Sequence, residues 1–344
     1  MHNLIIFFGG KSGERNVSVA SAQNMAQLTE RCQCWFWSPD GRVLEVPRDS
    51  LLAHQNPFEQ EFTPPDYKDL GALHQALPLV PSEGVLFLAV HGGEGENGTL
   101  QAALESAGVA FSGSDSQASA KAFDKAVAKD IVARVGLRVP RSITLRGEHL
   151  EDAAEQMRGF LQSTQQAVLK PVADGSSFGV HFVRDESTLQ AALQELKASP
   201  KSPYLFEERI IGRELTVGVL ETHEGVRALP CSEVLLATGR EFDYAGKYLG
   251  DGVQEVTPAD IPQSVAAAAQ DLAREAHLAL KCGGYSRTDI MLDETGLVFI
   301  ETNTLPGLSS ASFIPQQLEA ASLKLSDFLQ EQIELATRRR DARS

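Results

Sequence analysis

The chain has 344 residues, of which 42% are hydrophobic and 22% charged, and its formal net charge is -15. This length has room for two or three domains, and the composition is that of a globular protein rather than a disordered or fibrous one. The negative charge argues against general binding to nucleic acid or to an anionic membrane, although a small polyanion could bind through local lysines and a divalent metal.

Localisation and redox state follow from what the sequence lacks. No apolar run approaches the ~18 residues that span a bilayer, and residues 4–8 are too short for a secretory signal core. We therefore expect a cytoplasmic protein without a membrane partner. The four scattered cysteines predict free thiols. Cys32 and Cys34 could hold a soft metal, but packing is the favoured role because no histidine cluster surrounds them.

The first third of the chain predicts an α/β unit. Residues 4–8 are typical of a buried strand, which leads through a glycine-rich loop into a helix over about 16–30. A second strand over 84–90 ends at His91 and another glycine-rich loop. Active sites of open α/β sheets form at such strand ends. Residues 51–81 are left unassigned.

A helical region from Ser114 carries Phe123, Val127 and Ile131 at four-residue spacing and stops near Gly136, which predicts a domain boundary. Beyond it we expect, in order, a helix over 148–161, strands over 167–170 and 180–184, a helix over 263–281, a hairpin over 286–303 and a closing helix over 315–336. The three arginines at 338–340 are interpreted as a solvated, fraying terminus.

Two familiar nucleotide motifs do not fit. Gly10-Lys11-Ser12 resembles the end of a P-loop, but that motif requires glycine where Ile5 stands. The same segment lacks the complete glycine pattern of a dinucleotide fold, which argues against a dehydrogenase.

The glycine-serine loop after Lys170 lies between two predicted strands. Such a loop could fold over phosphate oxygens, with Lys170 adding a fixed positive charge. A plain hairpin is the alternative, but six or seven residues are long for one.

The hairpin over 286–303 carries a candidate metal site. Glu301 and Asn303 project from one face of a strand. If residues 294–296 form a three-residue turn with Gly296 in the left-handed position, Asp293 pairs with Leu297, and Asp289 falls opposite Glu301. Facing carboxylates need a cation, and an all-oxygen donor set suits Mg²⁺. The alternative is a polar surface hairpin, but the flanking strands are too apolar for it.

Several motifs occur in a fixed order over nearly the whole chain: residues 8–18 (FGGKSGERNVS), 91–101 (HGGEGENGTLQ), 124–125 (DK), the Gly175 loop, 243–248 (DYAGKY), 287–289 (RTD) and 301–307 (ETNTLPG). This set resembles the D-alanine-D-alanine ligases of the ATP-grasp superfamily. The resemblance implies an α/β, three-domain ATP-grasp fold and a homodimer. Its parts would be an N-terminal open α/β substrate domain over 1–115, a central subdomain with the phosphate flap over 116–205 and a C-terminal subdomain with the metal site over 206–344.

The resemblance also implies a role for individual residues, with ATP and D-alanine as the small-molecule substrates. ATP would be held by Lys125 and Lys170 at the phosphates, Gly175, Ser176 and Ser177 in the flap, Glu207 and Glu214 at adenine and ribose, and Lys247 at the γ-phosphate. Two Mg²⁺ ions, or Mn²⁺ in their place, would be held by Asp289, Glu301 and Asn303.

The implied reaction is ATP-dependent phosphorylation of one D-alanine, followed by attack of the second amine on the acyl phosphate. Glu14 would anchor the ammonium group of the first substrate, near Val17 and His91. Arg287 and the Gly307 N–H would stabilise the oxyanion, and Ser312 would receive the carboxylate of the second substrate. Glu14, Ser176 and Tyr248 would hold the mobile loop shut. Tyr248, where depsipeptide ligases of the family carry phenylalanine, favours a dipeptide product.

Some positions depart from the family pattern. Asn16 replaces an acidic residue, Ala245-Gly246 replaces Glu-Ala, and Ala311 and Phe313 replace histidine and leucine or methionine beside the second substrate. The main rival function is therefore a related ligase with another acceptor. A catalytically silent nucleotide-binding regulator is the rival from a different class.

Overall fold

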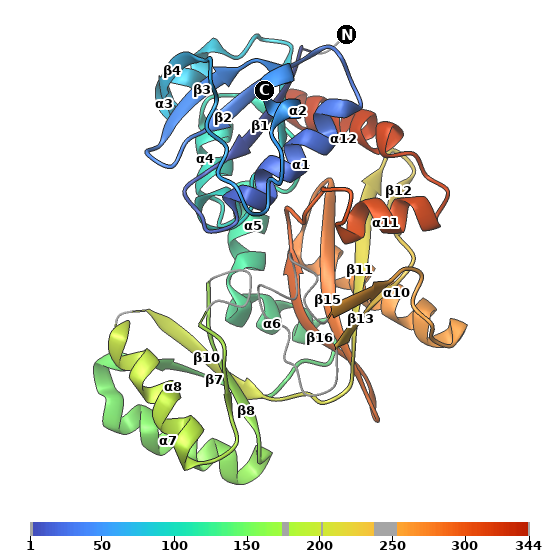
Figure 1. The fold of residues 1–344 in the computed structure, drawn as a ribbon. Coiled ribbons are helices and arrows are strands. Elements are labelled where there is room, and N and C mark those ends of the chain that lie inside the picture. Colours follow the sequence, from blue (N-terminus) through green and yellow to red (C-terminus); the bar gives the residue numbers. More distant parts are fainter. Residues whose placement is uncertain (1–2, 174–178, 201, 237–252, 343–344) are drawn as a thin grey trace.

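The computed structural model describes residues 3–173, 179–200, 202–236 and 253–342, which build three β-sheets and the helices that cover them (Figure 1). The N-terminal sheet has the strand order β4-β3-β2-β1-β5-β6. Its strands are β1 (Asn3–Gly9), β2 (Cys32–Trp37), β3 (Arg42–Val46), β4 (Lys68–Ala72), β5 (Gly84–Leu88) and β6 (Ala110–Phe111).

The centre of this sheet positions the first part of the site. β1 is parallel to both β2 and β5. A central strand covered on both faces must be apolar along its length, and residues 4–8 are all buried. Because β1 and β5 are parallel, their following loops meet at one edge, where the Ser12 hydroxyl donates to the His91 carbonyl at 2.5 Å. The two predicted strands are confirmed, the second ending two residues earlier than expected.

The helices of this domain are α1 (Arg15–Gln27), α2 (Arg48–Ala53), α3 (Leu73–Ala76) and α4 (Thr99–Ser106). The stretch that the sequence left unassigned holds the end of α2, all of β4 and α3. Phe62 fixes it to the core by an edge-on contact with Phe36, with ring centroids 5.2 Å apart.

The helical region expected from Ser114 to Gly136 is two helices, α5 (Ser116–Phe123) and α6 (Lys125–Arg134). Asp124 separates them because its backbone is extended, with φ -80° and ψ 102°, while its carboxylate accepts the Val127 N–H and caps α6. The four-residue spacing did not reveal this break, because an aspartate at a cap leaves the apolar pattern on both sides intact.

The second sheet has the order β7-β10-β8-β9 and antiparallel pairs. Two helices pack on it through Met157, Leu193 and the buried ring of Phe206. The elements are β7 (Ser142–Arg146), α7 (Leu150–Thr164), β8 (Ala167–Pro171), β9 (His181–Val183), α8 (Glu186–Ala198) and β10 (Pro203–Glu208).

The third sheet has the order β14-β13-β11-β15-β16, with β12 paired to β11. Helix α10 packs against it, and the expected helix over 263–281 and hairpin over 286–303 are confirmed with small shifts of their ends. The elements are β11 (Arg213–Thr222), β12 (Gly225–Ala228), β13 (Ser232–Leu236), β14 (Val253–Val256), α10 (Gln263–Leu280), β15 (Tyr285–Asp293) and β16 (Gly296–Asn303).

The single closing helix predicted over 315–336 is wrong, because two helices occupy this region, α11 (Phe313–Ala320) and α12 (Leu325–Asp341). Ser322 has φ +57°, a left-handed conformation that ends the first helix. The Leu323 N–H then turns back to the Leu318 carbonyl.

Helix α12 returns to the N-terminal domain, so both ends of the chain lie on the same part of the molecule (Figure 1). Arg339 donates to the Gly113 carbonyl and Arg340 to the Ser82 carbonyl, each at 2.5 Å. The expected fraying terminus is therefore wrong for these two arginines, whereas Arg338 is exposed. Phe328 and Leu329 belong to the same apolar core as β1 and β5.

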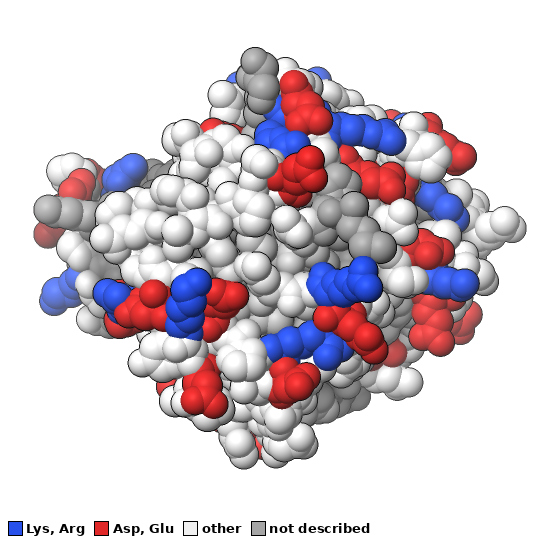
Figure 2. All heavy atoms as spheres, turned by 90° about the horizontal axis from the view of Figure 1, so that it is seen from above, with Lys and Arg blue, Asp and Glu red and all other residues white. Residues whose placement is uncertain are grey.

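Seen from above the N-terminal domain, the surface carries blue and red side chains next to each other around a largely uncharged centre (Figure 2). Exposed ion pairs of this domain include Arg42–Asp69 and Lys68–Glu45. Among the described residues, no helix is both long and apolar enough to cross a membrane.

Candidate active site

A cleft opens between the N-terminal domain, the third sheet and the start of α11. Its lining contains the following residues singled out from the sequence: Glu14, Val17, His91, Lys125, Glu214, Arg287, Asp289, Glu301, Asn303, Gly307, Ser312 and Phe313. Lys170 and Glu207 lie behind this lining in the core. Gly175, Ser176, Ser177, Lys247 and Tyr248 fall outside the described residues.

The carboxylates of the hairpin face each other as expected, but by a different register. Asp293 pairs with Gly296, so the turn is one residue shorter than predicted, and Gly296 has the positive φ of +129° expected of it. A β-bulge between Asp289 and Ile290 then shifts the register, and Asp289 lies opposite Glu301. The shorter turn and the bulge compensate each other.

Each of these carboxylates already has a cationic partner. Arg287 donates to both oxygens of Asp289 at 2.9 Å, and the Thr216 hydroxyl adds a bond of 2.6 Å. Lys125 lies 3.4 Å from Glu301. In Asn303, the side-chain oxygen accepts the Leu305 N–H at 3.0 Å. The candidate metal ligands Asp289, Glu301 and Asn303 all offer side-chain oxygens on one face of the hairpin. Such a set fits a hard divalent cation such as Mg²⁺.

Behind the cleft, Glu207 forms ion pairs with two lysines. Its carboxylate lies 2.6 Å from Lys170 and 3.0 Å from Lys129. Burial alone would raise the pKa of Glu207, but the two lysines lower it. Burial lowers the pKa of Lys129 to about 8, against the opposing effect of Glu207. For Lys170, burial alone would lower the pKa, but Glu207 and Glu301 together outweigh it and raise the pKa.

Sequence reasoning missed Lys129. It lies on the buried side of α6 with Ala128 and Val132, and its ammonium also donates to the Ile300 carbonyl at 2.8 Å. A lysine on the apolar stripe of an amphipathic helix was the signal available for finding it.

His91 joins the N-terminal domain to the loop that contains Gly307. Its Nδ1 lies 2.7 Å from the Leu305 carbonyl oxygen, and its Nε2 lies 2.8 Å from the Ser21 hydroxyl. Burial lowers the pKa of His91 and favours the neutral ring. Since a carbonyl only accepts, Nδ1 carries the proton and Nε2 accepts from Ser21. The Ser21 oxygen in turn accepts the Leu308 N–H at 3.0 Å.

The opposite wall is formed by the loop before α11. A Cβ added at Gly307 would lie 2.7 Å from the Ser312 hydroxyl oxygen, so a side chain at this position would displace that hydroxyl. Ser312 precedes the first turn of α11, where backbone N–H groups favour an anion. The Arg287 guanidinium lies 5.9 Å from the centre of the Phe313 ring.

Two further carboxylates line the cleft without having been assigned a role from the sequence. Glu96 is buried, and burial together with Glu14 raises the pKa of its carboxyl group well above the usual value. Glu255 accepts from the Gln316 side chain at 2.7 Å, and the same amide donates to the Ala311 carbonyl at 2.9 Å. Glu255 therefore lies beside the wall expected to contact the second substrate.

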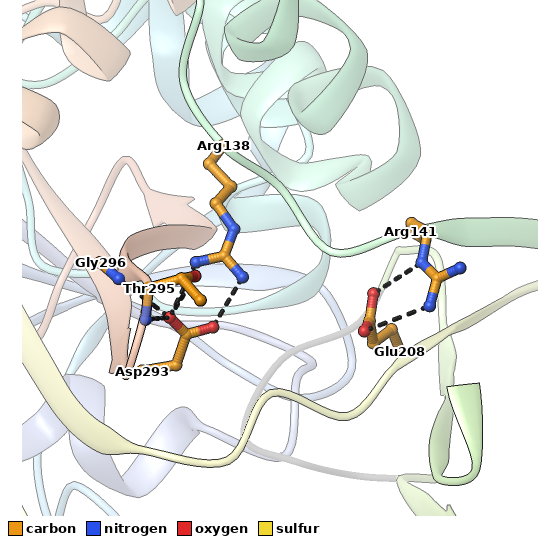
Figure 3. A network of polar contacts seen from close by, with 6 residues as sticks. All are labelled: Arg138, Arg141, Glu208, Asp293, Thr295 and Gly296. Atoms are coloured by element: carbon orange, nitrogen blue, oxygen red, sulfur yellow. Dashed lines mark hydrogen bonds and ion pairs between the residues drawn. The ribbon is translucent and has the colours of Figure 1, made fainter. Parts of the chain in front are cut away.

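The segment between α6 and β7 fastens the hairpin to the second sheet (Figure 3). Arg138 makes two bonds to Asp293, at 2.8 and 2.6 Å, and its carbonyl accepts the Phe299 N–H at 2.8 Å. Three residues later, Arg141 makes two bonds to Glu208 on β10, at 2.9 and 3.4 Å. These contacts hold β16, the edge strand of the third sheet, which carries Glu301.

Comparison with known proteins adds independent observations. Residues 3–114 match the family described as the D-ala D-ala ligase N-terminus, and residues 131–334 match the D-ala D-ala ligase C-terminus. The D-alanine–D-alanine ligase of Leptospira interrogans serovar Lai is 30% identical over 98% of this chain and 99% of its own length. That of Bordetella petrii is 37% identical over 94% of this chain and 88% of its own.

Solved structures give the same result. The VanG D-Ala:D-Ser ligase from Enterococcus faecalis superposes with a TM-score of 0.82 at 28% identity, covering 97% of this chain and 99% of its own. The D-alanine-D-alanine ligase from Coxiella burnetii superposes with a TM-score of 0.81 at 25% identity, covering 99% of this chain and 95% of its own.

Proposed function

The chain belongs to the D-alanine–D-alanine ligase family, which has the ATP-grasp fold, and from this membership we propose that it uses ATP to join two D-alanines into D-alanyl-D-alanine for peptidoglycan synthesis. One observation of the structure carries the proposal. A single cleft unites Glu14 and His91 with the paired carboxylates Asp289 and Glu301 and with the Gly307 loop. Under this proposal, the same cleft would supply the ammonium-binding end, the metal-binding face and the donors for a developing oxyanion.

The nucleotide would lie between the second and third sheets. Lys125 and Lys170 would bind its phosphates, Glu207 its adenine amino group and Glu214 its ribose. Lys247 and the 175–177 flap, outside the described residues, would complete this part. The three structural sheets support a division into an N-terminal domain and two ATP-grasp subdomains.

Two Mg²⁺ ions would bind Asp289, Glu301 and Asn303. The described residues contain no group of three or more His, Cys, Asp or Glu side chains placed to hold a metal, so phosphate oxygens and water would supply the other ligands, as Mg²⁺ commonly requires. When bound, the ions neutralise charge on the transferring phosphoryl group.

The chain's own groups would then act on the amino acids. Glu14 would hold the ammonium group of the first D-alanine. The carboxylate of that D-alanine can then accept the γ-phosphoryl group. The amine of the second D-alanine attacks the acyl phosphate, and the oxyanion that forms lies between Arg287 and the Gly307 N–H, which act as electrostatic stabilisers. Ser312 orients the second carboxylate. Collapse of the intermediate breaks the bond from carbon to the phosphate oxygen, the phosphate leaves with the proton of the attacking amine, and the amide forms.

The deciding experiment measures phosphate release from ATP and Mg²⁺ with D-alanine alone and identifies the product by mass. We expect D-alanyl-D-alanine, lost in Glu301→Ala and retained in Glu294→Ala, an exposed carboxylate in the turn of the same hairpin.

A ligase that uses a different second substrate is the alternative function that the site supports. Glu255, Ala311 and Phe313 all line the cleft, and a carboxylate there could bind an acceptor with a hydrogen-bonding side chain. The assay should therefore include D-alanine mixed with D-serine and other amino acids. Phosphate release with a mixture but not with D-alanine alone would reject D-alanyl-D-alanine as the product and leave the ATP chemistry in place.

A further inference from the structure

Three charged side chains share one buried site behind the cleft. Lys129 is 3% exposed, Glu207 is 4% exposed and Lys170 is 7% exposed. Both ammonium groups contact the same carboxylate, at 3.0 Å and 2.6 Å. One lysine would suffice to neutralise Glu207. Burying the ammonium group of a second lysine costs free energy unless further interactions offset it.

The two lysines differ in what else holds them. Lys129 is fixed by a helix and by its bond to the Ile300 carbonyl at 2.8 Å. Lys170 is the fourth residue of β8, five positions before Gly175, where the flap expected to close over phosphates begins. Under the proposed function, Lys170 has to turn from Glu207 to the phosphates when the nucleotide binds. Lys129 has no such second task.

We propose that Lys129 is a positioning residue, the permanent counter-ion that keeps Glu207 in place to accept the nucleotide's 6-amino group after Lys170 has turned to the phosphates. This inference rests on the proposed ATP site. It assigns the two lysines separate tasks, since one holds the carboxylate and the other moves to the ligand.

A purely structural ion pair makes a different prediction. If Lys129 only stabilised the fold, its removal would lower the melting temperature and weaken the binding of all nucleotides equally. If it positions Glu207, its removal weakens selectively those nucleotides that carry the amino group.

The test is calorimetric binding of ADP and of purine riboside 5′-diphosphate, which lacks the 6-amino group, with no amino acid present. A hydrogen bond to a charged group corresponds to a preference for ADP of roughly tenfold or more. We expect this preference in the wild type, its fall to about twofold or less in Lys129→Gln, and its recovery in Lys129→Arg. Arg158→Gln, which removes an exposed ion pair in the same subdomain, is the matched control and should keep the preference. An unchanged preference in folded Lys129→Gln overturns the proposal.

Lys170→Gln decides the matter even if Lys129→Gln does not fold. This variant should bind both nucleotides more weakly and keep the preference for ADP, because Lys129 still holds Glu207. Loss of the preference in Lys170→Gln would show that Lys170 holds the carboxylate in the complex, against the proposal. Failure of the proposed function looks different. If the wild type did not bind ADP, the proposed ATP site itself would be rejected. If the enzyme joined D-alanine to a different second substrate, every result of this binding experiment would stay the same.

Discussion

The Ser21 hydroxyl connects helix α1, the histidine loop and the loop around Gly307. It donates to His91 at 2.8 Å and accepts the Leu308 N–H at 3.0 Å. His91 in turn donates to the Leu305 carbonyl at 2.7 Å. The expected oxyanion donor thus lies in a loop held on both sides by this relay.

Ser21→Ala should therefore affect both stability and rate. It leaves the Leu308 N–H and the His91 nitrogen buried without a partner, at a cost of about 1 to 3 kcal/mol each. A loosened Gly307 loop should also lower kcat by about tenfold. Thermal unfolding and steady-state kinetics check both effects, with Ser106→Ala on the exposed face of α4 as the control. An unchanged kcat would mean that the relay does not position the loop.

Residues within motifs were the ones that the sequence could reveal. Glu14, Arg287 and Asn303 belong to the ordered motifs at residues 8–18, 287–289 and 301–307. Ser21 could not be found in this way, because it lies on a helix face where a sequence predicts packing, and the only signal for Lys129 was a charge on the apolar stripe of α6. Only the folded chain shows what they contact.

Among the elements, the hairpin of β15 and β16 shows what alternation along a strand specifies and what it does not. The face shared by Glu301 and Asn303 follows from the period of two and was predictable. The turn length was predicted one residue too long, and the bulge beside Ile290 was not foreseen. Neither error changed the pairing of Asp289 with Glu301, because a bulge restores the register that a shorter turn shifts.

The same hairpin should show a pH-dependent stability. Asp293 accepts bonds from Arg138, from Thr295 and from the Gly296 N–H, and the bond from Arg138 is the largest cause that lowers the pKa of its carboxyl group. A folded pKa below the unfolded value of about 3.9 gives a stabilisation that is present above that value and lost as the pH falls through the folded pKa.

Asp293→Asn should accordingly destabilise the protein by about 1 kcal/mol at pH 7, since Arg138 is largely exposed and the pair is screened. The difference from the wild type should shrink below about pH 4. Urea unfolding at a series of pH values measures it, and Glu294→Gln in the same turn serves as the control. A difference independent of pH would exclude this carboxylate as its source.

At the scale of the whole molecule, the last helix closes the first domain. Arg339 and Arg340 donate to carbonyls of Gly113 and Ser82, while Arg338 is exposed one position earlier. The three-part fold could be predicted because its motifs are spread along the chain. This closure could not, since a run of arginines at a terminus has the same composition whether it is solvated or docked.

Replacement of both Arg339 and Arg340 by alanine should lower stability by about 3 kcal/mol, because each makes a charged hydrogen bond to a carbonyl. Arg338→Ala should change it by less than about 0.5 kcal/mol. Thermal unfolding compares the variants, and equal losses would mean that the docking contributes little.

The return of α12 also bears on how the protein folds during synthesis. Phe328 and Leu329 belong to the core that surrounds β1 and β5, so the domain that leaves the ribosome first lacks part of its interior until the last helix appears. At translation rates of about 5 to 20 residues per second, the roughly 200 residues in between take roughly 10 to 40 s. During that interval the apolar side chains that α12 covers on the first domain, among them Val85 and Ala110, lack their partner from the last helix.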